Sequence, residues 1–352
     1  MKKEATHWPA ALRRVAAPRR ETDPGRDERA KNNMANVIIR PDWRLPERLV
    51  TPERVGWDRR RFLHQSGLAG AALLAAPLAG HSTAGEPPAP STSPGFPAKR
   101  NPAFNPNWKL TDAAVAASYN NFYEYTLDKS RVQRLAQRLP TSPWPLQIGG
   151  LVDKPLTIDA WDLMAEMPQE ERVYRFRCVE AWAMIVPWTG FPFSKLIEKV
   201  SPKSEAKFVR METFNRRDWA PGMAELPRYP WPYFEGLRMD EALHPLTMVV
   251  TGIYGKPLPK QHGAPIRLVV PWKYGYKSIK SIVKIEFIAT QPKTFWETLA
   301  PDEYPFESNV NPAVPHPRWS QATERMIDTN DRVRTLPYNG YADQVAKLYP
   351  KG

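Results

Sequence analysis

The sequence predicts an α+β fold built from short strands, short helices and long ordered loops. Three observations predict it. Runs typical of strands outnumber helical segments. The two kinds do not alternate regularly, as they would in a doubly wound sheet. Finally, 39 of the 352 residues are proline, which interrupts helix hydrogen bonding. With 42% hydrophobic and 25% charged residues, the rest of the composition is that of a globular protein.

Six runs bounded by Pro, Gly or Asn are expected to be strands: 144–150, 171–179, 207–214, 246–254, 266–270 and 281–289. Five shorter segments are helical candidates: 111–119, 129–139, 157–166, 192–200 and 339–349. The sequence V-P-W-T-G-F-P at 186–192 is expected to form a rigid loop. No P-loop is present and no G-x-G-x-x-G opens a helix, so nucleotide cofactors of the kinase or dehydrogenase type are unsupported.

The basic charge is distributed in a way that argues against nucleic acid as a partner. The formal net charge is +13, from 50 Lys and Arg against 37 Asp and Glu. Residues 1–84 hold 16 of the basic and 9 of the acidic residues, which is about half of the excess. The remainder is spread through the body without long basic runs, as expected of a solvated surface.

An export signal is predicted at 58–84. D-R-R-R-F-L at 58–63 precedes a 14-residue apolar run at 67–80, and small residues lead to Ala84. This order is typical of a signal peptide of the twin-arginine pathway, and the run is too short to span a bilayer. A short buried helix behind an accidental arginine cluster is the alternative. Export through the twin-arginine translocase, cleavage near Ala84 and a periplasmic location are therefore expected.

The chain is divided by composition into four parts. Residues 1–57 form a basic, proline-rich extension, which is either disordered or an over-extended reading frame with Met34 as the true start. The signal peptide at 58–84 is followed by a Pro/Ser-rich linker at 85–100. Residues 101–352 form the main folded domain.

Cys178 is the only cysteine, which excludes an intrachain disulfide and a four-cysteine zinc site. It follows a strand-like run and shares one face with Tyr174 and Phe176. Such a residue is most often a packed small hydrophobe. A nucleophilic thiol would need a base, and no local signature supplies one. A thiolate that binds a soft metal needs no base, but the other metal ligands would then have to come from a cofactor.

Two further motifs suit a large polar ligand. Y-N-N-F-Y-E at 119–124 places amides, aromatics and a carboxylate in a short loop. The run at 262–280 contains four cations among Gly, Pro and aromatic residues: Arg267, Lys273, Lys277 and Lys280. Cations on turns favour a phosphate-bearing ligand. A basic edge strand with aromatic packing is the plain alternative.

The quoted motifs, together with R-C-V-E-A-W at 177–182, H-P-L-T at 244–247 and the run from Asn311 to Arg325, resemble the sulfite-oxidase-like molybdenum family. Within it they are most similar to the catalytic molybdopterin subunits of periplasmic protein-methionine-sulfoxide reductases. The resemblance covers most of 101–352. It implies a molybdopterin-binding fold of mixed sheets with short helices. It also implies one molybdenum–molybdopterin cofactor without an appended nucleotide.

The resemblance also implies the site. Cys178 would be both the catalytic residue and the protein ligand of molybdenum. The implied cofactor-binding residues are Asn120, Tyr123, Glu124, Thr213, His262, Arg267, Ser278, Ile279 and Lys280. The family pattern has Asn where this chain has His262, so that contact would come from the ring or the backbone.

The implied activity is the repair of methionine sulfoxide in oxidised periplasmic proteins, by oxygen-atom transfer to molybdenum. Electrons would come from a membrane haem-containing, quinol-oxidising subunit. Two alternatives remain open: a sulfite-oxidase-like dehydrogenase that acts on a small substrate, and a non-enzymatic exported binding protein. Sulfite oxidation is disfavoured because Glu180 and Trp182 follow Cys178, where a small dianion would need arginines.

Overall fold

The computed structural model describes residues 95–350. The predicted N-terminal extension, the signal peptide and most of the linker lie outside these residues, so those predictions stay as they are. Within the described part, no helix combines the length and apolar character needed to cross a membrane.

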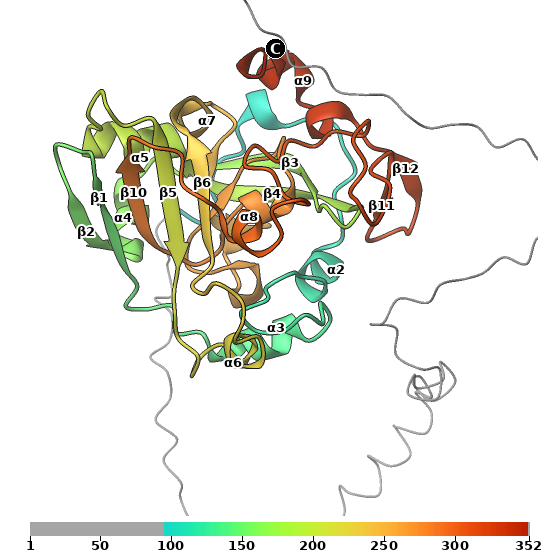
Figure 1. The fold of residues 1–352 in the computed structure, drawn as a ribbon, viewed down its shortest axis with the longest axis horizontal. Coiled ribbons are helices and arrows are strands. Elements are labelled where there is room, and N and C mark those ends of the chain that lie inside the picture. The colour runs from blue at the N-terminus through green and yellow to red at the C-terminus, as the bar shows by residue number, and fades with distance from the viewer. Residues whose placement is uncertain (1–94, 351–352) are drawn as a thin grey trace, which may run out of the picture. The chain divides into compact units, whose positions relative to one another are not determined.

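One sheet has five strands in the order β2-β1-β10-β5-β6 and lies on the left of Figure 1. Its strands are β1 (Pro145–Gly150), β2 (Leu156–Asp159), β5 (Phe208–Thr213), β6 (Phe234–Arg238) and β10 (Ile282–Ile288). The pair β1–β10 is parallel and the other pairs are antiparallel. Side chains alternate between buried and partly exposed along β5, because only one face of this strand meets the core.

The second sheet has seven strands and carries the candidate site. Its strands are β3 (Glu170–Arg177), β4 (Trp182–Pro192), β7 (Met248–Ile253), β8 (Lys256–Pro257), β9 (Arg267–Val269), β11 (Thr323–Met326) and β12 (Arg332–Arg334). The main path is β12-β11-β4-β7-β8, while β3 pairs with β4 and β9 pairs with β7. The pair β11–β4 is parallel, whereas β3 and β7 are antiparallel to β4. Ten residues of β4 are buried, so this strand runs through the core.

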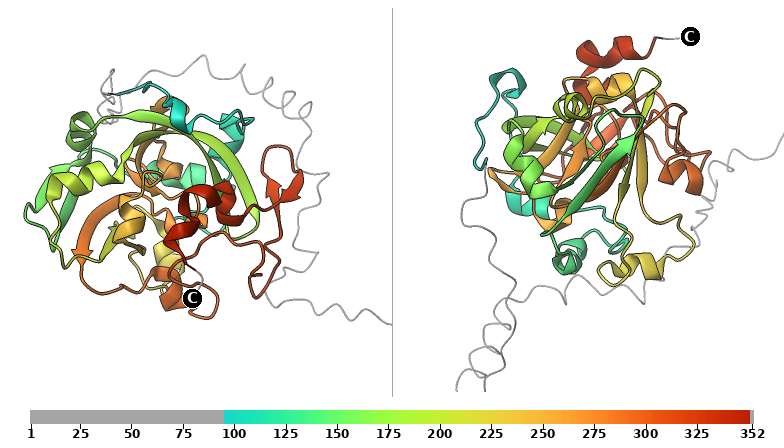
Figure 2. Two further views of the ribbon diagram at one scale, coloured as in Figure 1. Left: turned by 90° about the horizontal axis from the view of Figure 1, so that it is seen from above. Right: turned by 90° about the vertical axis from the view of Figure 1, so that its left-hand side faces the viewer.

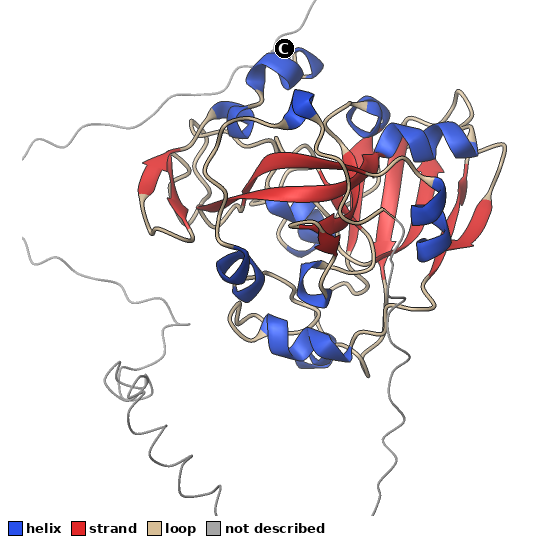
Figure 3. Ribbon diagram, turned by 180° about the vertical axis from the view of Figure 1, so that it is seen from behind, coloured by secondary structure: helices blue, strands red, loops and turns tan. Residues whose placement is uncertain are grey.

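The helices of the described residues are short and lie around the strands (Figures 2 and 3). They are α2 (Ala113–Ser118), α3 (Val132–Leu135), α4 (Ala160–Glu166), α5 (Phe193–Val200), α6 (Pro221–Glu225), α7 (Met239–Leu243), α8 (Phe295–Leu299) and α9 (Ala342–Val345). Short 3-10 turns span Pro102–Phe104, Ala136–Arg138, Lys260–His262, Gly275–Lys277, Pro337–Gly340 and Ala346–Leu348. One continuous core of buried side chains links both sheets. The predicted α+β class, with mixed sheets and short helices, is confirmed.

All six predicted strands are present, each within two residues of the expected bounds. Two predictions are wrong. The expected loop at 186–192 belongs to β4, and the start of the expected helix at 157–166 belongs to β2. The strand tolerates Pro187 because β7 pairs with β4 only from Trp188 onward, so the missing N–H removes no bond of that ladder. Asp159 ends β2 and caps α4. Its side chain accepts a hydrogen bond from the N–H of Trp161, so the helix begins at Ala160, directly after the strand.

Candidate active site

Cys178 lies in the tight turn between β3 and β4. Its N–H donates to the Trp182 carbonyl at 2.9 Å, and its carbonyl accepts from the N–H of Ala181 at 3.1 Å. Ala181 has φ of 60°, a left-handed conformation that is uncommon for a residue with a side chain. The turn therefore holds the thiol in one position at the end of a buried strand, as the alternation of 173–178 predicts.

Residues 319–325, just before and within β11, hold this turn in place by hydrogen bonds. Trp319 Nε1 and Gln321 Nε2 both donate to the Val179 carbonyl, each at 2.7 Å. The N–H of Arg325 donates to the Ala181 carbonyl at 2.9 Å. Beneath the turn, the fully buried Arg177 hydrogen-bonds the Cys178 carbonyl and pairs with Glu324 at 2.8 Å. Buried pairs of this kind are costly to break, so the backbone around the thiol is rigid.

The thiol faces a cavity that holds about 910 Å³ of space between atoms, its open mouth included. Eight of the nine residues implied as cofactor contacts line it with Cys178: Asn120, Tyr123, Glu124, His262, Arg267, Ser278, Ile279 and Lys280. They come from the loop after α2, the turn before β9, the first residue of β9 and the turn before β10. Thr213 does not line the cavity. Its hydroxyl donates to the Ser281 carbonyl at 2.9 Å, behind the turn that carries Lys280.

Three polar groups surround Cys178 Sγ. Asn121 Nδ2 and the backbone N–H of Glu180 both donate to it, each at 3.4 Å, and Glu180 Oε2 lies 3.8 Å away. Burial, and then the Glu180 carboxylate, raise the pKa of this thiol to about 12. Without a cation the thiol therefore keeps its proton at neutral pH, which argues against a free nucleophile. A metal ion would reverse this balance, because coordination deprotonates a thiol.

Glu180 accepts hydrogen bonds from several side chains at the cavity wall. The donors are Asn121 Nδ2 at 3.2 Å, Tyr123 Oη at 3.1 Å and Trp182 Nε1 at 3.2 Å, and Lys129 Nζ lies 3.0 Å away. Burial acts to raise the pKa of Glu180, but Lys129 and these hydrogen bonds outweigh it, so that the pKa falls below its ordinary value. Glu180 is therefore an anion at neutral pH.

Two cations line the cavity away from its mouth: Arg267, which is fully buried, and Lys280, which is partly exposed. Arg267 donates only to carbonyls, those of Leu268, His262 and Ser278, at 2.9–3.2 Å. Lys280 Nζ donates to the Asn121 carbonyl. Among the described residues, no carboxylate lies within ion-pair distance of either. Burial lowers the pKa of both groups, to about 9 for Arg267 and to about 7 for Lys280.

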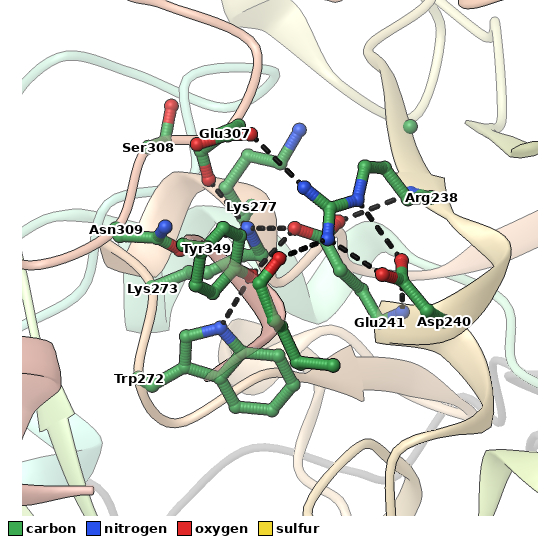
Figure 4. A network of polar contacts seen from close by, with 12 residues as sticks. Arg238, Asp240, Glu241, Trp272, Lys273, Lys277, Glu307, Ser308, Asn309 and Tyr349 are labelled. Atoms are coloured by element: carbon green, nitrogen blue, oxygen red, sulfur yellow. Dashed lines mark hydrogen bonds and ion pairs between the residues drawn. The ribbon is translucent and has the colours of Figure 1, made fainter. Parts of the chain in front are cut away.

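Lys273 and Lys277, the other two cations of the 262–280 run, have different partners. Lys273 Nζ pairs with Glu241 Oε1 at 2.6 Å and also donates to Asn309 Oδ1, in the network shown in Figure 4. Lys277 pairs with the buried Glu235 at 2.8 Å. The expectation that all four cations suit a phosphate is therefore wrong for these two, because both are neutralised by carboxylates within the core.

His262 remains neutral at the cavity wall. Burial, and then the charges of Arg267 and Lys280, lower the pKa of its ring to about 3. The adjacent Gly263 has φ of 94° and packs against Lys280: a Cβ there would lie 2.4 Å from that of Lys280. A glycine at this position thus lets the two turns approach closely.

These residues fit an anionic organic chelate that carries a metal. Neither Arg267, which is fully buried, nor Lys280 forms an ion pair with a carboxylate of the described residues, although the charge of Glu124 acts to raise the pKa of Lys280; such cations are costly to bury unless a ligand supplies an anion. Asn121 Oδ1 is buried without a hydrogen-bond partner and lines the same cavity. The described residues contain no group of three His, Cys, Asp or Glu side chains able to hold a metal ion. Cys178 would thus give one ligand, and the chelate would give the others.

Several cavity residues were not found by sequence reasoning. Asn121 is one residue from the expected Asn120 and, unlike it, contacts the thiol; the side chain of Asn120 donates instead to the Ala117 carbonyl. Trp296 and Tyr304 come from the segment after β10 and line the mouth. No local pattern marks these aromatics, since their position depends on how that segment crosses the site.

The sequence of this chain matches known proteins. Residues 134–296 match the family model of the oxidoreductase molybdopterin binding domain. The protein-methionine-sulfoxide reductase catalytic subunit MsrP of Xanthomonas axonopodis pv. citri is 48% identical over 87% of this chain and 95% of its own length. The corresponding subunit of Xanthomonas campestris pv. campestris is 47% identical over 89% and 97%.

Among solved structures, the sulfane dehydrogenase SoxCD of Paracoccus pantotrophus aligns with a TM-score of 0.41 and 16% identity, over 62% of this chain and 61% of that one. The sequence relatives are far closer and span nearly their whole length. The chain therefore belongs to the family of protein-methionine-sulfoxide reductase catalytic subunits, which are molybdopterin oxidoreductases.

Proposed function

We propose that this chain reduces methionine sulfoxide in exported proteins, with a molybdenum–molybdopterin cofactor bound in the cavity beside Cys178. The reaction consumes two electrons and two protons, breaks the sulfur–oxygen bond, and yields methionine and water. It reverses an oxidation that makes an apolar side chain polar. The observation that carries the proposal is one cavity that joins a buried thiol, two cations with no ion pair to a carboxylate of the described residues, and an aromatic mouth.

When bound, the cofactor supplies the two-electron redox chemistry. Cys178 would hold the metal, and Arg267 and Lys280 would hold the anionic part of the chelate by charge-assisted hydrogen bonds. The cofactor proposed carries no appended nucleotide, as the resemblance to the family implies. Asn121 Nδ2 and the N–H of Glu180 would stabilise the thiolate, because both already donate to Sγ.

The protons have a route along the wall of the cavity. Burial acts to lower the pKa of Lys129, but the Glu180 carboxylate outweighs it and raises the pKa, so that Lys129 is charged at neutral pH. Its side chain is 21% exposed and touches Glu180, which also accepts from Tyr123. Lys129 is already protonated, so it can pass a proton to Glu180 and regain one from water, and Glu180, oriented by the hydrogen bond from Tyr123, can deliver the proton to the departing oxygen.

The charges near the thiol favour a neutral substrate. Glu180 is an anion 3.8 Å from Cys178 Sγ and would repel sulfite. The mouth is formed by aromatic side chains, including Tyr119, Trp182 and Trp296, which suit the methyl and methylene groups of a sulfoxide. This argument favours sulfoxide reduction over the oxidation of a small dianion.

We place the reaction in the periplasm, on the basis of the twin-arginine signal expected at 58–84. Electrons would return from a membrane haem subunit that oxidises quinols. The relatives are named as catalytic subunits, which supports the existence of a second subunit. The single cysteine of this chain leaves no dithiol that could store electrons.

Anaerobic turnover with a reduced dye tests the activity without the partner. The purified chain, produced with molybdate, is given a methionine-sulfoxide peptide, and loss of one oxygen is followed by mass spectrometry. We expect methionine in proportion to the dye oxidised, and about one molybdenum per chain. The matched control is the same peptide with methionine sulfone in place of the sulfoxide.

Two outcomes would contradict the proposal. Oxidation of sulfite by the chain, without reduction of the peptide, would favour the dehydrogenase alternative. A chain without molybdenum after production in molybdate-replete cells would favour an exported binding protein.

A further inference from the structure

A second cavity continues the active-site cavity toward solvent. Six residues line both, among them Tyr119, Glu180 and Trp296. Six others line only the outer one: Leu127, Lys129, Tyr229, Arg318, Trp319 and Arg325. We call these six the outer vestibule. They comprise three cations and three apolar or aromatic side chains, with no carboxylate.

The three cations of the outer vestibule differ in their partners. Lys129 pairs with Glu180 at 3.0 Å, and Arg318 pairs with Glu303 at 2.7 Å. Arg325 has no carboxylate within ion-pair distance among the described residues. Its guanidinium donates to Asn330 Oδ1 at 2.9 Å and to the Tyr119 hydroxyl at 3.4 Å, and lies over the Tyr119 ring at 5.5 Å. Arg325 is thus oriented by neutral groups while its charge remains unmatched.

The backbone and rings around Arg325 are held in place. Arg325 lies on β11 and pairs with Trp182, the first residue of β4. The turn that carries Cys178 comes directly before this residue. Trp319 donates to the Val179 carbonyl at 2.7 Å and stacks on His316 with ring centroids 3.8 Å apart. Leu127 is half exposed. A rigid aromatic surface with one unmatched cation therefore surrounds the path to the thiol.

We propose that the outer vestibule binds the polypeptide on either side of the oxidised methionine, and that Arg325 selects segments with an acidic residue near it. The inference rests on the proposed function and names its substrate class. A small sulfoxide fills only the inner cavity, whereas a peptide whose sulfoxide reaches the thiol must cross these six residues. Charge complementarity then favours Asp or Glu beside the sulfoxide and disfavours Lys or Arg.

Three peptides of equal length test the proposal, with acidic, neutral or basic residues flanking one methionine sulfoxide. Anaerobic kcat/KM is measured with a reduced dye, so that no protein electron donor takes part. We expect the wild-type chain to prefer the acidic over the basic peptide roughly five-fold, as for an exposed ion pair, mainly through KM. The preference should shrink as salt is added, because exposed charges are screened.

The decisive quantity is the ratio of kcat/KM for the acidic and basic peptides, which is independent of how much cofactor each preparation holds. Arg325→Gln should bring this ratio near one, and Arg325→Glu should invert it. The matched control is Lys203→Glu, which makes the same change of charge at an exposed position between α5 and β5 that lines neither cavity. This control should keep the wild-type ratio.

Each contrary result has its own meaning. Equal kcat/KM for the three peptides in the wild-type chain overturns the docking proposal and leaves sulfoxide reduction intact. An unchanged kcat/KM ratio in Arg325→Glu also overturns it. If Arg325→Glu lowers turnover only when a membrane electron donor replaces the dye, the outer vestibule binds the donor and not the substrate. If the wild-type chain reduces neither these peptides nor dimethyl sulfoxide, the proposed function falls as well.

Discussion

The two ends of the active-site cavity differ in the partners of their positively charged side chains. At the inner end, Arg267 and Lys280 donate hydrogen bonds to carbonyl oxygens and lie over aromatic rings, and neither forms an ion pair with a carboxylate of the described residues. At the mouth, Lys129 and Arg318 are each matched by a carboxylate, and the remaining wall is largely aromatic. A cation without an ion pair deep in the cavity favours a ligand that stays. A largely aromatic surface, where Arg325 is the one cation of three without a carboxylate partner among the described residues, suits a substrate that comes and goes. The difference separates a resident cofactor from a passing substrate.

The largest expected effect contrasts two lysines three residues apart. Lys277→Met leaves Glu235 buried without its partner and should lower the free energy of unfolding by about 3–5 kcal/mol. Lys280→Met removes a cation that has no ion pair within the described residues and interacts with Glu124 only through its charge, so the fold should lose less stability than in Lys277→Met. It should instead weaken retention of the chelate about 10–100-fold, as for a lost charge-assisted hydrogen bond.

Urea unfolding and molybdenum per chain, measured on both variants, check this contrast. Loss of molybdenum in folded Lys277→Met, or full molybdenum in Lys280→Met, would contradict the assignment of the two lysines.

Glu180→Gln tests whether the carboxylate at the wall acts in the reaction. Gln keeps the shape but cannot carry the charge that Lys129 and Tyr123 address, so kcat should fall about 100-fold while molybdenum content stays the same. Glu303→Gln, which alters a carboxylate bonded to Arg318 at the mouth, is the control and should change kcat little. A Glu180→Gln variant with wild-type kcat would leave Glu180 a structural role only.

A pH titration of stability tests the neutral state of His262. The pKa of this ring is about 3 in the folded chain, against an ordinary value of 6.5, so between these values the unfolded chain binds the extra proton. Stability therefore rises with pH across this window, and acidification from pH 7 to pH 5 should cost about 2 kcal/mol. His262→Asn should remove this part of the pH dependence. Urea unfolding of the cofactor-free chain at the two pH values measures it, and parallel curves for both proteins would refute it.

The smallest effect is expected at the mouth. Trp296 lies against Tyr304 with ring centroids 4.9 Å apart and lines both cavities. Trp296→Leu should raise KM for a sulfoxide peptide about five-fold, because an aromatic contact is worth about 1 kcal/mol. Molybdenum content should not change. If molybdenum fell in this variant, the separation between the two ends of the cavity would be wrong.

The sequence predicted the site better than the strands around it. The alternation of 173–178 places Cys178 correctly at a strand end, and the local motifs identify most of the cavity wall. By contrast, Pro187 and Pro192 led to the prediction of a loop at 186–192, where β4 continues. A local pattern does not show which backbone N–H groups must form hydrogen bonds between strands. Lys273 and Lys277 could not be told from Lys280, since their partners Glu241 and Glu235 are distant in sequence and meet them only in the fold.

The central claim is that one thiol of this chain binds the metal, and X-ray absorption at the molybdenum edge tests it most directly. The wild-type chain and Cys178→Ser are compared after both are shown to hold the cofactor. The account predicts one sulfur neighbour fewer per molybdenum in Cys178→Ser, together with loss of sulfoxide reduction. An identical sulfur count in the two proteins would show that Cys178 does not bind the metal.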